Sequence, residues 1–378
     1  MKFDTVIVGG GLAGMVAGIA LQKAGRQTAI VSMGQNALHF FSGSFESMLE
    51  APEAVKSIFE EAGIRLHYTP GVRLMPMGTF RESALSLEDI SLFPDEKIGR
   101  KALIVNFVGY HDFFSSFLAE GLEKQGLECR ICFLNLGEFL QSEPVPGQMR
   151  SVHIASRLDR EWEKVVQEVR VLLKDDDTVI LPQVFGLEDP SIPSRIRRAI
   201  PAQVVFAGTL PPSVPGVRTL KLLRKRYEVL GGTYLMGDEV TGAHIHEGAV
   251  HSVETKNLGT HYLEAKTFIL AAGGFFSKGL QSTPTAITEP VFGADVSFPE
   301  DRNQWYAPSF AASQPYMNFG VMADEKLRVY KGGVPMKNLW AIGSILGQGR
   351  GDFGIGAGLA IRSALAAANV ILSEAKNL

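Results

Sequence analysis

The stretch that decides the fold is Phe3-Asp4-Thr5-Val6-Ile7-Val8-Gly9-Gly10-Gly11-Leu12-Ala13-Gly14. Its first six residues indicate a buried parallel strand, and its end matches the pattern G-x-G-x-x-G at Gly9, Gly11 and Gly14. Small and apolar residues then continue at helical spacing, and residues 27–31 indicate the next strand. A glycine turn between a strand and a helix lets the backbone approach a phosphate, which the helix N-terminus attracts. The pattern predicts a dinucleotide-binding domain at the start of the chain.

One polar residue usual in such a domain is absent. A dinucleotide fold places Asp or Glu about 20 residues after the glycine turn, where the carboxylate binds a ribose hydroxyl. Ser32 stands at that position, and no Asp or Glu occurs between Met15 and Phe45. A serine hydroxyl can bond a ribose, but without the strength of a charged acceptor. FMN, which has no adenosine, accounts for the gap; FAD held by Ser32 is the alternative.

Two later glycine turns also follow apolar strands. Residues 267–274 come after four short β-type runs that predict a β-meander, and they resemble the second flavin motif of two-dinucleotide-fold flavoproteins. Residues 339–344 resemble the third motif, with Ser344 in place of the usual Asp. A glycine-rich helix start follows, whose N–H groups would face the flavin pyrimidine ring. The residues expected to hold the cofactor are Gly9, Gly11, Gly14, Ser32, Ser42, Gly43, Ser44, Ala272, Gly273, Gly343, Ser344, Gly354 and Gly356.

Less common motifs carry a more specific resemblance, and they extend over essentially the full chain. They are the opening stretch itself, Gln35–Phe40 leading into Ser42-Gly43-Ser44, Thr209–Ser213, Gly237–Val240, Gly274–Ser277 and Ala341–Ser344. With these segments the chain resembles the B-subunit of the anaerobic glycerol-3-phosphate dehydrogenase.

That resemblance implies a flavin-dependent oxidation of sn-glycerol 3-phosphate to dihydroxyacetone phosphate. It implies electron transfer to a quinone, with fumarate or nitrate as terminal acceptor in anaerobic respiration. It also implies FMN in this chain, a larger catalytic, FAD-bearing subunit, and an iron–sulfur subunit that anchors the complex to the membrane. The chain is then expected in the cytoplasm, peripheral on the inner face of the membrane through its partners.

The expected fold class is α/β: a Rossmann-like FAD/NAD(P)-binding flavoprotein domain with a β-meander, plus an inserted α/β cap or substrate domain. We expect residues 1–50, 217–285 and 336–378 to form the flavin-binding domain. Residues 51–216 and 286–335 are expected to form the inserted domain, which contacts substrate or another subunit. The apolar stretch at 353–372 is expected to be a buried helix rather than a membrane span, because Arg362 and Asn369 interrupt it.

Composition narrows the function. The chain has 378 residues, 46% of them apolar, and a formal net charge of −3, which argues against a nucleic-acid binder. Its two cysteines, Cys129 and Cys132, are too few for a disulfide scaffold or a four-thiolate iron–sulfur cluster. They lie in a predicted strand, where residues three apart point to opposite faces, so a structural role is expected. A chain without a cluster must pass electrons to another protein.

Alcohol oxidation by a flavin needs a base for the hydroxyl proton and cations for the substrate phosphate. His39 is the candidate base or flavin neighbour, beside Ser42-Gly43-Ser44; the alternative is a structural histidine packed among phenylalanines. Ser213 and Arg218 are candidate substrate ligands, although a basic helix face or subunit contact also accounts for Arg218. The meander histidines at 244, 246 and 251 are expected to be surface residues, and no metal site is expected.

Two other functions stay open. The first is a stand-alone flavin reductase of activated double bonds, which the order of the glycine motifs and the meander also fits. Against it, the closing segment shows no His/Arg pair resembling the substrate clamp of that group. The second is a non-catalytic electron-relay or assembly subunit, which the serines at the two usual acid positions favour. Flavin content and co-purification with partner subunits separate these possibilities.

Overall fold

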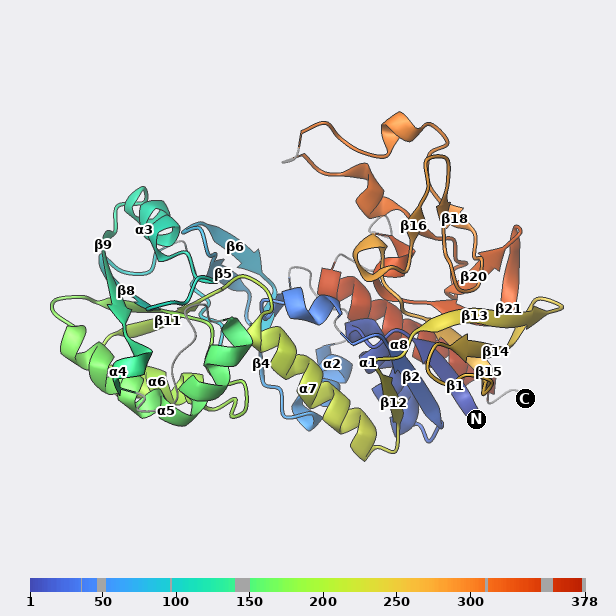
Figure 1. The fold of residues 1–378 in the computed structure, drawn as a ribbon, viewed down its shortest axis with the longest axis horizontal. Helices are drawn as coiled ribbons and strands as arrows, with labels where there is room; N and C mark the ends of the chain where they lie inside the picture. Colours follow the sequence, from blue (N-terminus) through green and yellow to red (C-terminus); the bar gives the residue numbers. More distant parts are fainter. Residues whose placement is uncertain are drawn as a thin grey trace. The chain divides into compact units, whose positions relative to one another are not determined.

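The computed structural model describes residues 1–34, 36–45, 52–95, 97–139, 150–309, 312–347 and 356–375. The chain forms two compact units (Figure 1). Unit 1 comprises Met1–Ala37, Ser47–Gly63 and Leu222–Leu378, and unit 2 comprises Leu38–Glu46 and Ile64–Lys221. The chain therefore passes between the units four times, and the last division falls within one helix, α7 (Val214–Val229).

Unit 1 is built on an eight-stranded sheet. Six of its strands follow the order β12-β2-β1-β15-β14-β13; of the other two, β21 pairs with β15 and β20 pairs with β21. The strands β12, β2, β1, β15 and β21 run parallel, whereas β13, β14 and β20 are antiparallel to their neighbours. The bounds are β1 Lys2–Val8, β2 Thr28–Ser32, β12 Thr233–Met236, β13 Val240–His246, β14 Ala249–Thr255, β15 Leu263–Leu270, β20 Arg328–Lys331 and β21 Val334–Ala341. This confirms the expected Rossmann-like sheet with its β-meander.

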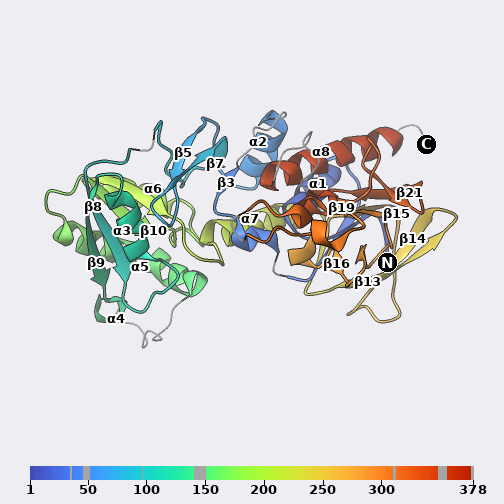
Figure 2. The ribbon, with the colours of Figure 1, turned by 90° about the horizontal axis from the view of Figure 1, so that it is seen from above.

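Two apolar helices pack together in unit 1: α1 (Leu12–Lys23), which follows the first glycine turn, and α8 (Gly356–Ala375) (Figure 2). Among the described residues, α8 is the helix long and apolar enough to cross a membrane by length and composition alone. Small and apolar side chains of α8, such as Ala364 and Ala368, are buried. Packing on α1 gives α8 the place of a core helix, as expected from the charged and polar interruptions of its sequence.

Residues 286–335 were expected in the inserted domain, but the structure groups them with unit 1. The reason is strand pairing, because β20 pairs with β21 of the large sheet and β18 (Val296–Ser297) pairs with β19 (Gly320–Val321). The rest of this stretch contains only short elements among its described residues, such as η3 (Arg302–Gln304) and η4 (Pro315–Asn318). Three further short elements lie near its start: η2 (Phe275–Ser277), β16 (Gln281–Ser282) and β17 (Ile287–Thr288). Helix α2 (Pro52–Glu61), for which no element was expected, also belongs to unit 1.

Unit 2 contains a four-stranded parallel sheet with the order β11-β10-β8-β9. Its strands and helices alternate, as expected of an inserted α/β domain: β8 Lys101–Phe107, α3 Ser115–Glu123, β9 Glu128–Leu134, α5 Ser151–Leu172, β10 Thr178–Pro182, α6 Ile192–Ala199 and β11 Gln203–Ala207. The short helix α4 (Leu136–Phe139) follows β9. Small antiparallel sheets complete the unit: β3 (Ser44–Phe45), β7 (Leu85–Leu87) and β4 (Leu66–His67), and the pair β5 (Gly71–Leu74) and β6 (Phe80–Ser83).

Candidate functional site

The parallel strands of unit 1 end at a common edge. Ala341 lies opposite Leu270, Leu270 opposite Val8, Val8 opposite Val31, and Val31 opposite Leu235. The residues that follow this row are therefore neighbours, and they include all three predicted glycine turns. Ligands of open parallel sheets bind outside this carboxyl edge. The structure thus brings together most of the residues expected to hold a cofactor.

The three glycines of the first turn have different structural surroundings. A Cβ at Gly9, whose φ is +120°, would lie 2.1 Å from the carbonyl oxygen of Ala271, and a Cβ at Gly14 would lie 2.0 Å from that of Gly9. These two glycines are required for the close packing of β1, α1 and β15. A Cβ at Gly11 would meet nothing within 4 Å. Gly11 precedes the first residue of α1, so the open space lies at a helix N-terminus with unpaired N–H groups.

The second and third turns converge on this edge. A Cβ at Gly273 would lie 3.5 Å from the Ser344 hydroxyl, and a Cβ at Gly343 would lie 2.9 Å from the Cβ of Ala13 in α1. Gly343 is held in place because its N–H donates to Ser363 Oγ of α8 at 2.8 Å. Ser344 is exposed, so its hydroxyl is available beside the open first turn.

Helix α8 begins at Gly356, which is exposed, and a Cβ there would meet nothing within 4 Å. The other glycine expected at this helix start, Gly354, lies outside the described residues. Ala272 is half-buried directly after the row of strand ends.

Ser32 occupies the expected place at the end of β2, but it is buried. Its Oγ accepts the N–H of Gly34 at 3.3 Å, and a Cβ at Gly10 would meet both Ser32 Oγ at 2.6 Å and Tyr234 Oη at 2.4 Å. Burial raises the pKa of Tyr234, which keeps this phenol neutral. Ser32 is therefore part of a packed hydroxyl contact behind the first turn, while the side chain of Asn36 donates to Gly10 O at 3.0 Å.

The remaining candidates belong to unit 2. His39 is half-buried in the turn η1 (Ala37–Phe40), and its carbonyl oxygen accepts the N–H of Ser213 at 2.7 Å. The Ser213 hydroxyl donates to Phe41 O at 2.7 Å and accepts the N–H of Gly216 at 3.3 Å. Ser213 thus caps the start of α7 and fastens the His39 segment to it. Its hydroxyl already has two partners, which argues against the expected substrate contact.

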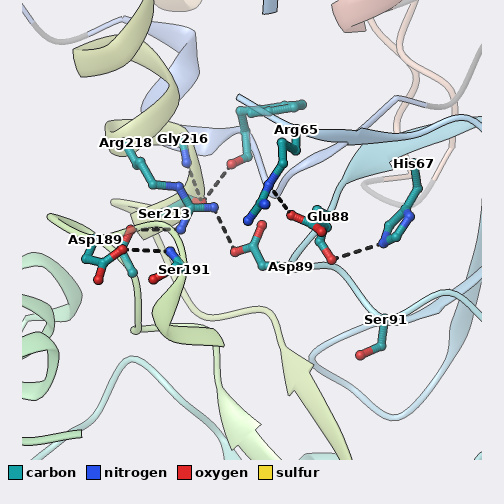
Figure 3. Close-up of polar contacts among 12 residues, drawn as sticks. Arg65, His67, Glu88, Asp89, Ser91, Asp189, Ser191, Ser213, Gly216 and Arg218 are labelled. Atoms are coloured by element: carbon teal, nitrogen blue, oxygen red, sulfur yellow. Dashed lines mark hydrogen bonds and ion pairs between the residues drawn. The ribbon is translucent and has the colours of Figure 1, made fainter. Parts of the chain in front are cut away.

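Arg218 is buried in an ion pair and does not present a phosphate-binding cation. Its guanidinium donates to Asp89 Oδ2 at 2.7 Å (Figure 3) and to Gly186 O at 2.8 Å, and the residue is 5% exposed. The Glu88–Asp89 turn is also held by Arg65, whose Nε lies 2.5 Å from Glu88 Oε2, and by His67 on Glu88 O. A guanidinium buried in this ion pair stabilises unit 2, which argues against the expected contact of Arg218 with substrate phosphate.

The segment Ser42-Gly43-Ser44 forms the edge of a small sheet. Gly43 O accepts the N–H of Leu87 at 2.8 Å, and Ser44 lies directly opposite Ser86. The hydroxyls of Ser44 and Ser86 are buried, and neither has a hydrogen-bond partner among the described residues. Ser42 itself is half-buried.

Other predicted features take ordinary structural places. Cys129 and Cys132 lie on β9 as unpaired thiols, as expected, and burial raises the pKa of Cys129 to about 11. His244 lies on the exposed meander, 2.9 Å from Glu254 Oε1 and edge-on to Tyr262. Within the described ranges, no three His, Cys, Asp or Glu side chains gather as a metal-binding group would.

A parallel sheet whose glycine turns meet at one edge beside a helix N-terminus defines a dinucleotide-binding flavoprotein. The comparison with protein families agrees: residues 4–58 and 47–361 match the family model described as FAD binding domain. The chain belongs to this family and, within it, to the family of B-subunits of the anaerobic glycerol-3-phosphate dehydrogenase. It is 36% identical over 421 residues to the B-subunit of the anaerobic glycerol-3-phosphate dehydrogenase of Pectobacterium atrosepticum, with 99% of each chain covered.

Two further relatives carry the same name. The B-subunit of Yersinia enterocolitica is 32% identical, with 99% of both chains covered. That of Pasteurella multocida is 33% identical, with 99% of this chain and 100% of the relative covered. The family resemblance recognised from scattered motifs is thereby confirmed over the full length.

The residues at the edge of unit 1 fit a flavin. The open side of Gly11 is a cradle that a Cβ would fill, and it lies at the start of α1. Sequence reasoning found this cradle from its spacing. Sequence reasoning missed Tyr234, which packs against Ser32, and Asp89, which forms an ion pair with Arg218. No local sequence pattern indicates a partner on a distant strand or turn.

Proposed function

We propose that this chain is a flavin-bearing component of a dehydrogenase complex that oxidises sn-glycerol 3-phosphate to dihydroxyacetone phosphate and delivers electrons to a quinone. The observation that carries the proposal is the end-to-end similarity to proteins named as the B-subunit of that dehydrogenase. The convergence of three glycine turns at one sheet edge supports the flavin part. Fumarate or nitrate as terminal acceptor follows from the same family relationship.

For the cofactor at the edge of unit 1 we propose FAD in preference to FMN, which was expected from the missing ribose acid. The matched family model is that of an FAD-binding domain. Ser32 lacks a carboxylate and is buried under Tyr234, so the adenosine ribose would rely on neighbouring polar groups such as Asn36. The first-turn N–H groups of α1 would hold the phosphates, and Gly273, Gly343 and Ser344 would face the flavin end.

A bound flavin supplies the hydride acceptor for alcohol oxidation. The side chain of His39 would hold the hydroxyl proton, and Ser213 would act through the His39 backbone rather than on the substrate. Ser42, Gly43 and Ser44 would border the same ligand. As partners we propose a larger FAD-bearing subunit with an iron–sulfur subunit, which would hold this chain peripherally at the inner face of the membrane.

The test is to purify the chain alone and with its partner subunits, release the flavin by denaturation, and identify it by chromatography. We expect about one flavin per chain, running as FAD, and bleaching of the flavin absorbance by sn-glycerol 3-phosphate in the complex. A colourless chain that takes up no flavin would refute the proposal. If sn-glycerol 3-phosphate bleaches the flavin of the partner subunits equally well without this chain, the chain is dispensable for oxidation of the substrate. That result would instead establish the electron-relay function.

A further inference from the structure

The strand order of the unit 2 sheet singles out one edge. The chain goes from β8 outward to β9 on one side, then returns past β8 to β10 and continues to β11 on the other side. The point where the winding reverses lies between β8 and β10. In open parallel sheets the ligand binds outside the carboxyl ends of the two strands that flank such a point. In unit 2 those ends are Phe107 and Pro182.

A polar cluster lies beyond these strand ends and around the start of α5. Asp112 follows β8, and its Oδ2 accepts both the N–H of Ser151 at 3.0 Å and the Ser151 hydroxyl at 3.1 Å. Tyr110 Oη lies 2.8 Å, and Thr209 Oγ1 3.3 Å, from Ser151 Oγ. Thr209 opens the segment 209–213, which is one of the motifs on which the family resemblance is based, and the cofactor site of unit 1 makes no use of Thr209.

Arg150 is the cation of this cluster. Its Nη1 lies 3.1 Å from Asp112 Oδ1, and its Nη2 donates to Pro211 O at 2.8 Å. Nevertheless, 56% of the side chain is exposed. Two contacts hold the guanidinium in one place, while more than half of the side chain stays accessible. Because Arg150 also immediately precedes the 22 residues of α5, its charge adds to the positive end of the helix dipole.

An unpartnered buried amide lies at the same strand ends. Gln183 directly follows β10, is 5% exposed, and its Nε2 has no hydrogen-bond partner among the described residues. Its N–H donates to Ala207 O, two residues before Thr209. Continuing the β8–β10 register places Gln183 beside Phe107. The Phe107 ring packs on Tyr110, whose hydroxyl lies within hydrogen-bond distance of Ser151 at the start of α5, so Phe107 and Tyr110 connect Gln183 to that helix start.

We propose that the carboxyl edge of the unit 2 sheet is a binding site for a phosphate monoester. Gln183 Nε2 is a donor without an acceptor, Arg150 is an accessible cation, and the carboxylate of Asp112 is already used by Arg150 and Ser151. The site therefore lacks an anion rich in acceptors. Two ligands implied by the family resemblance carry a phosphate monoester: sn-glycerol 3-phosphate, which is the substrate of the proposed function, and FMN. The identity of the ligand rests on the proposed function, whereas the proposal that a phosphate monoester binds here does not.

The experiment measures binding of sn-glycerol 3-phosphate and of FMN to the full chain by calorimetry, with glycerol and riboflavin as the forms without phosphate. We expect one of the two monoesters to bind, and both R150M and Q183L to weaken its binding at least about tenfold, as for hydrogen bonds to a charged group. K101M is the matched control, because it removes a cation from the start of β8, at the opposite end of the strands. It should leave the affinity unchanged.

Thermal unfolding separates a lost ligand contact from a damaged fold. Because Gln183 Nε2 is unpartnered, Q183L should melt at the wild-type temperature or above it when no ligand is present. Equal affinity of wild type, R150M and Q183L for both monoesters would overturn the proposal. So would a loss confined to R150M, which would reflect surface charge only. A chain without flavin, or a complex not bleached by sn-glycerol 3-phosphate, would refute the proposed function and leave this binding test intact.

Discussion

The two parallel sheets end in chemically different ways. At the carboxyl edge of unit 1 the residues after the strands are glycines and small side chains, and the space beside Gly11 is open. At the corresponding edge of unit 2, charged and hydroxyl side chains bond one another, as Asp112, Arg150 and Ser151 do. In the sites proposed above, unit 1 would offer backbone N–H groups to a ligand, whereas unit 2 would offer side chains.

This difference teaches where each unit is vulnerable. The unit 1 edge depends on the absence of a Cβ, so adding a single methyl group there meets backbone atoms that cannot move aside. Unit 2 depends on buried charges that must stay paired, so removing one partner exposes the other to a low-dielectric surrounding. The comparison is therefore tested best by adding a Cβ to a glycine of unit 1 and by removing one partner of a buried ion pair in unit 2.

The largest effect is expected from R218M in unit 2. The substitution would leave the Asp89 carboxylate buried without its ion-pair partner, which destabilises proteins by about 3–5 kcal/mol. Chemical denaturation of the purified chain measures this. The control K221M lies one turn further along α7 and breaks an exposed pair with Glu188, so it should cost less than about 1 kcal/mol.

The same pair of variants also decides the original expectation for Arg218. If the guanidinium binds substrate phosphate, R218M will weaken binding of sn-glycerol 3-phosphate while unfolding at the wild-type denaturant concentration. That combination would contradict the buried ion pair as its main function.

The next largest effect is expected from G14A in unit 1. The new Cβ would lie 2.0 Å from Gly9 O, so strand and helix must separate, at a cost of about 3 kcal/mol. G11A is its matched control, because the same methyl group enters open space. We expect G11A to melt as wild type but to retain flavin about tenfold less tightly, roughly 1.4 kcal/mol. Flavin-to-protein ratios after gel filtration, with melting curves, distinguish the two; a G11A chain with full flavin would place the ligand elsewhere.

The sequence predicted the regular parts of both units. In unit 1, the strand β1 and its turn follow from one apolar run before three spaced glycines, and the meander follows from short alternating runs. In unit 2, strands and helices of ordinary length alternate, so their periods are distinct. Residues 64–95 escaped prediction because their strands are two to four residues long and carry no clear period.

Side-chain partners could not be predicted in the same way. Arg218 and Asp89 are 129 residues apart, and nothing near either residue indicates the other. Residues 38–46 belong to unit 2 through the pairing of β3 with β7 and through Ser213, which donates to the carbonyl groups of His39 and Phe41. Such backbone contacts leave no trace in residue type. The turns of unit 1 were predictable because a glycine requirement is written in the sequence itself.

A smaller, pH-dependent effect is expected at Glu61 of unit 1. Hydrogen bonds from Lys23 and Ser57, with Arg226 at 2.5 Å, lower the pKa of Glu61 to about 2. A lowered pKa stabilises the folded chain above the ordinary value of 4.5, and this contribution is lost as the pH falls from 4.5 towards 2. Because the side chain is 36% exposed, solvent screening limits it to about 1 kcal/mol.

Denaturation at a series of pH values tests this contribution. E61Q should be less stable than wild type at pH 7 and should approach it near pH 2. The control E120Q removes an exposed pair with Lys124 on α3 of unit 2 and should follow the wild-type curve throughout. Parallel curves for E61Q and wild type would contradict the prediction, because they would show that the charge of Glu61 contributes nothing to stability.

The smallest effect is expected from S32A, although Ser32 occupies the position at which a dinucleotide fold usually binds ribose. Its hydroxyl is buried beside Tyr234 and accepts from Gly34 at 3.3 Å, so S32A removes one neutral hydrogen bond, worth about 1 kcal/mol of folding stability. Flavin affinity should change less than about threefold, and Y234F should behave alike because it alters the same contact. A tenfold loss of FAD affinity in S32A alone would mean that the hydroxyl turns outward to the ribose, and unit 1 would then also offer a side chain to its ligand.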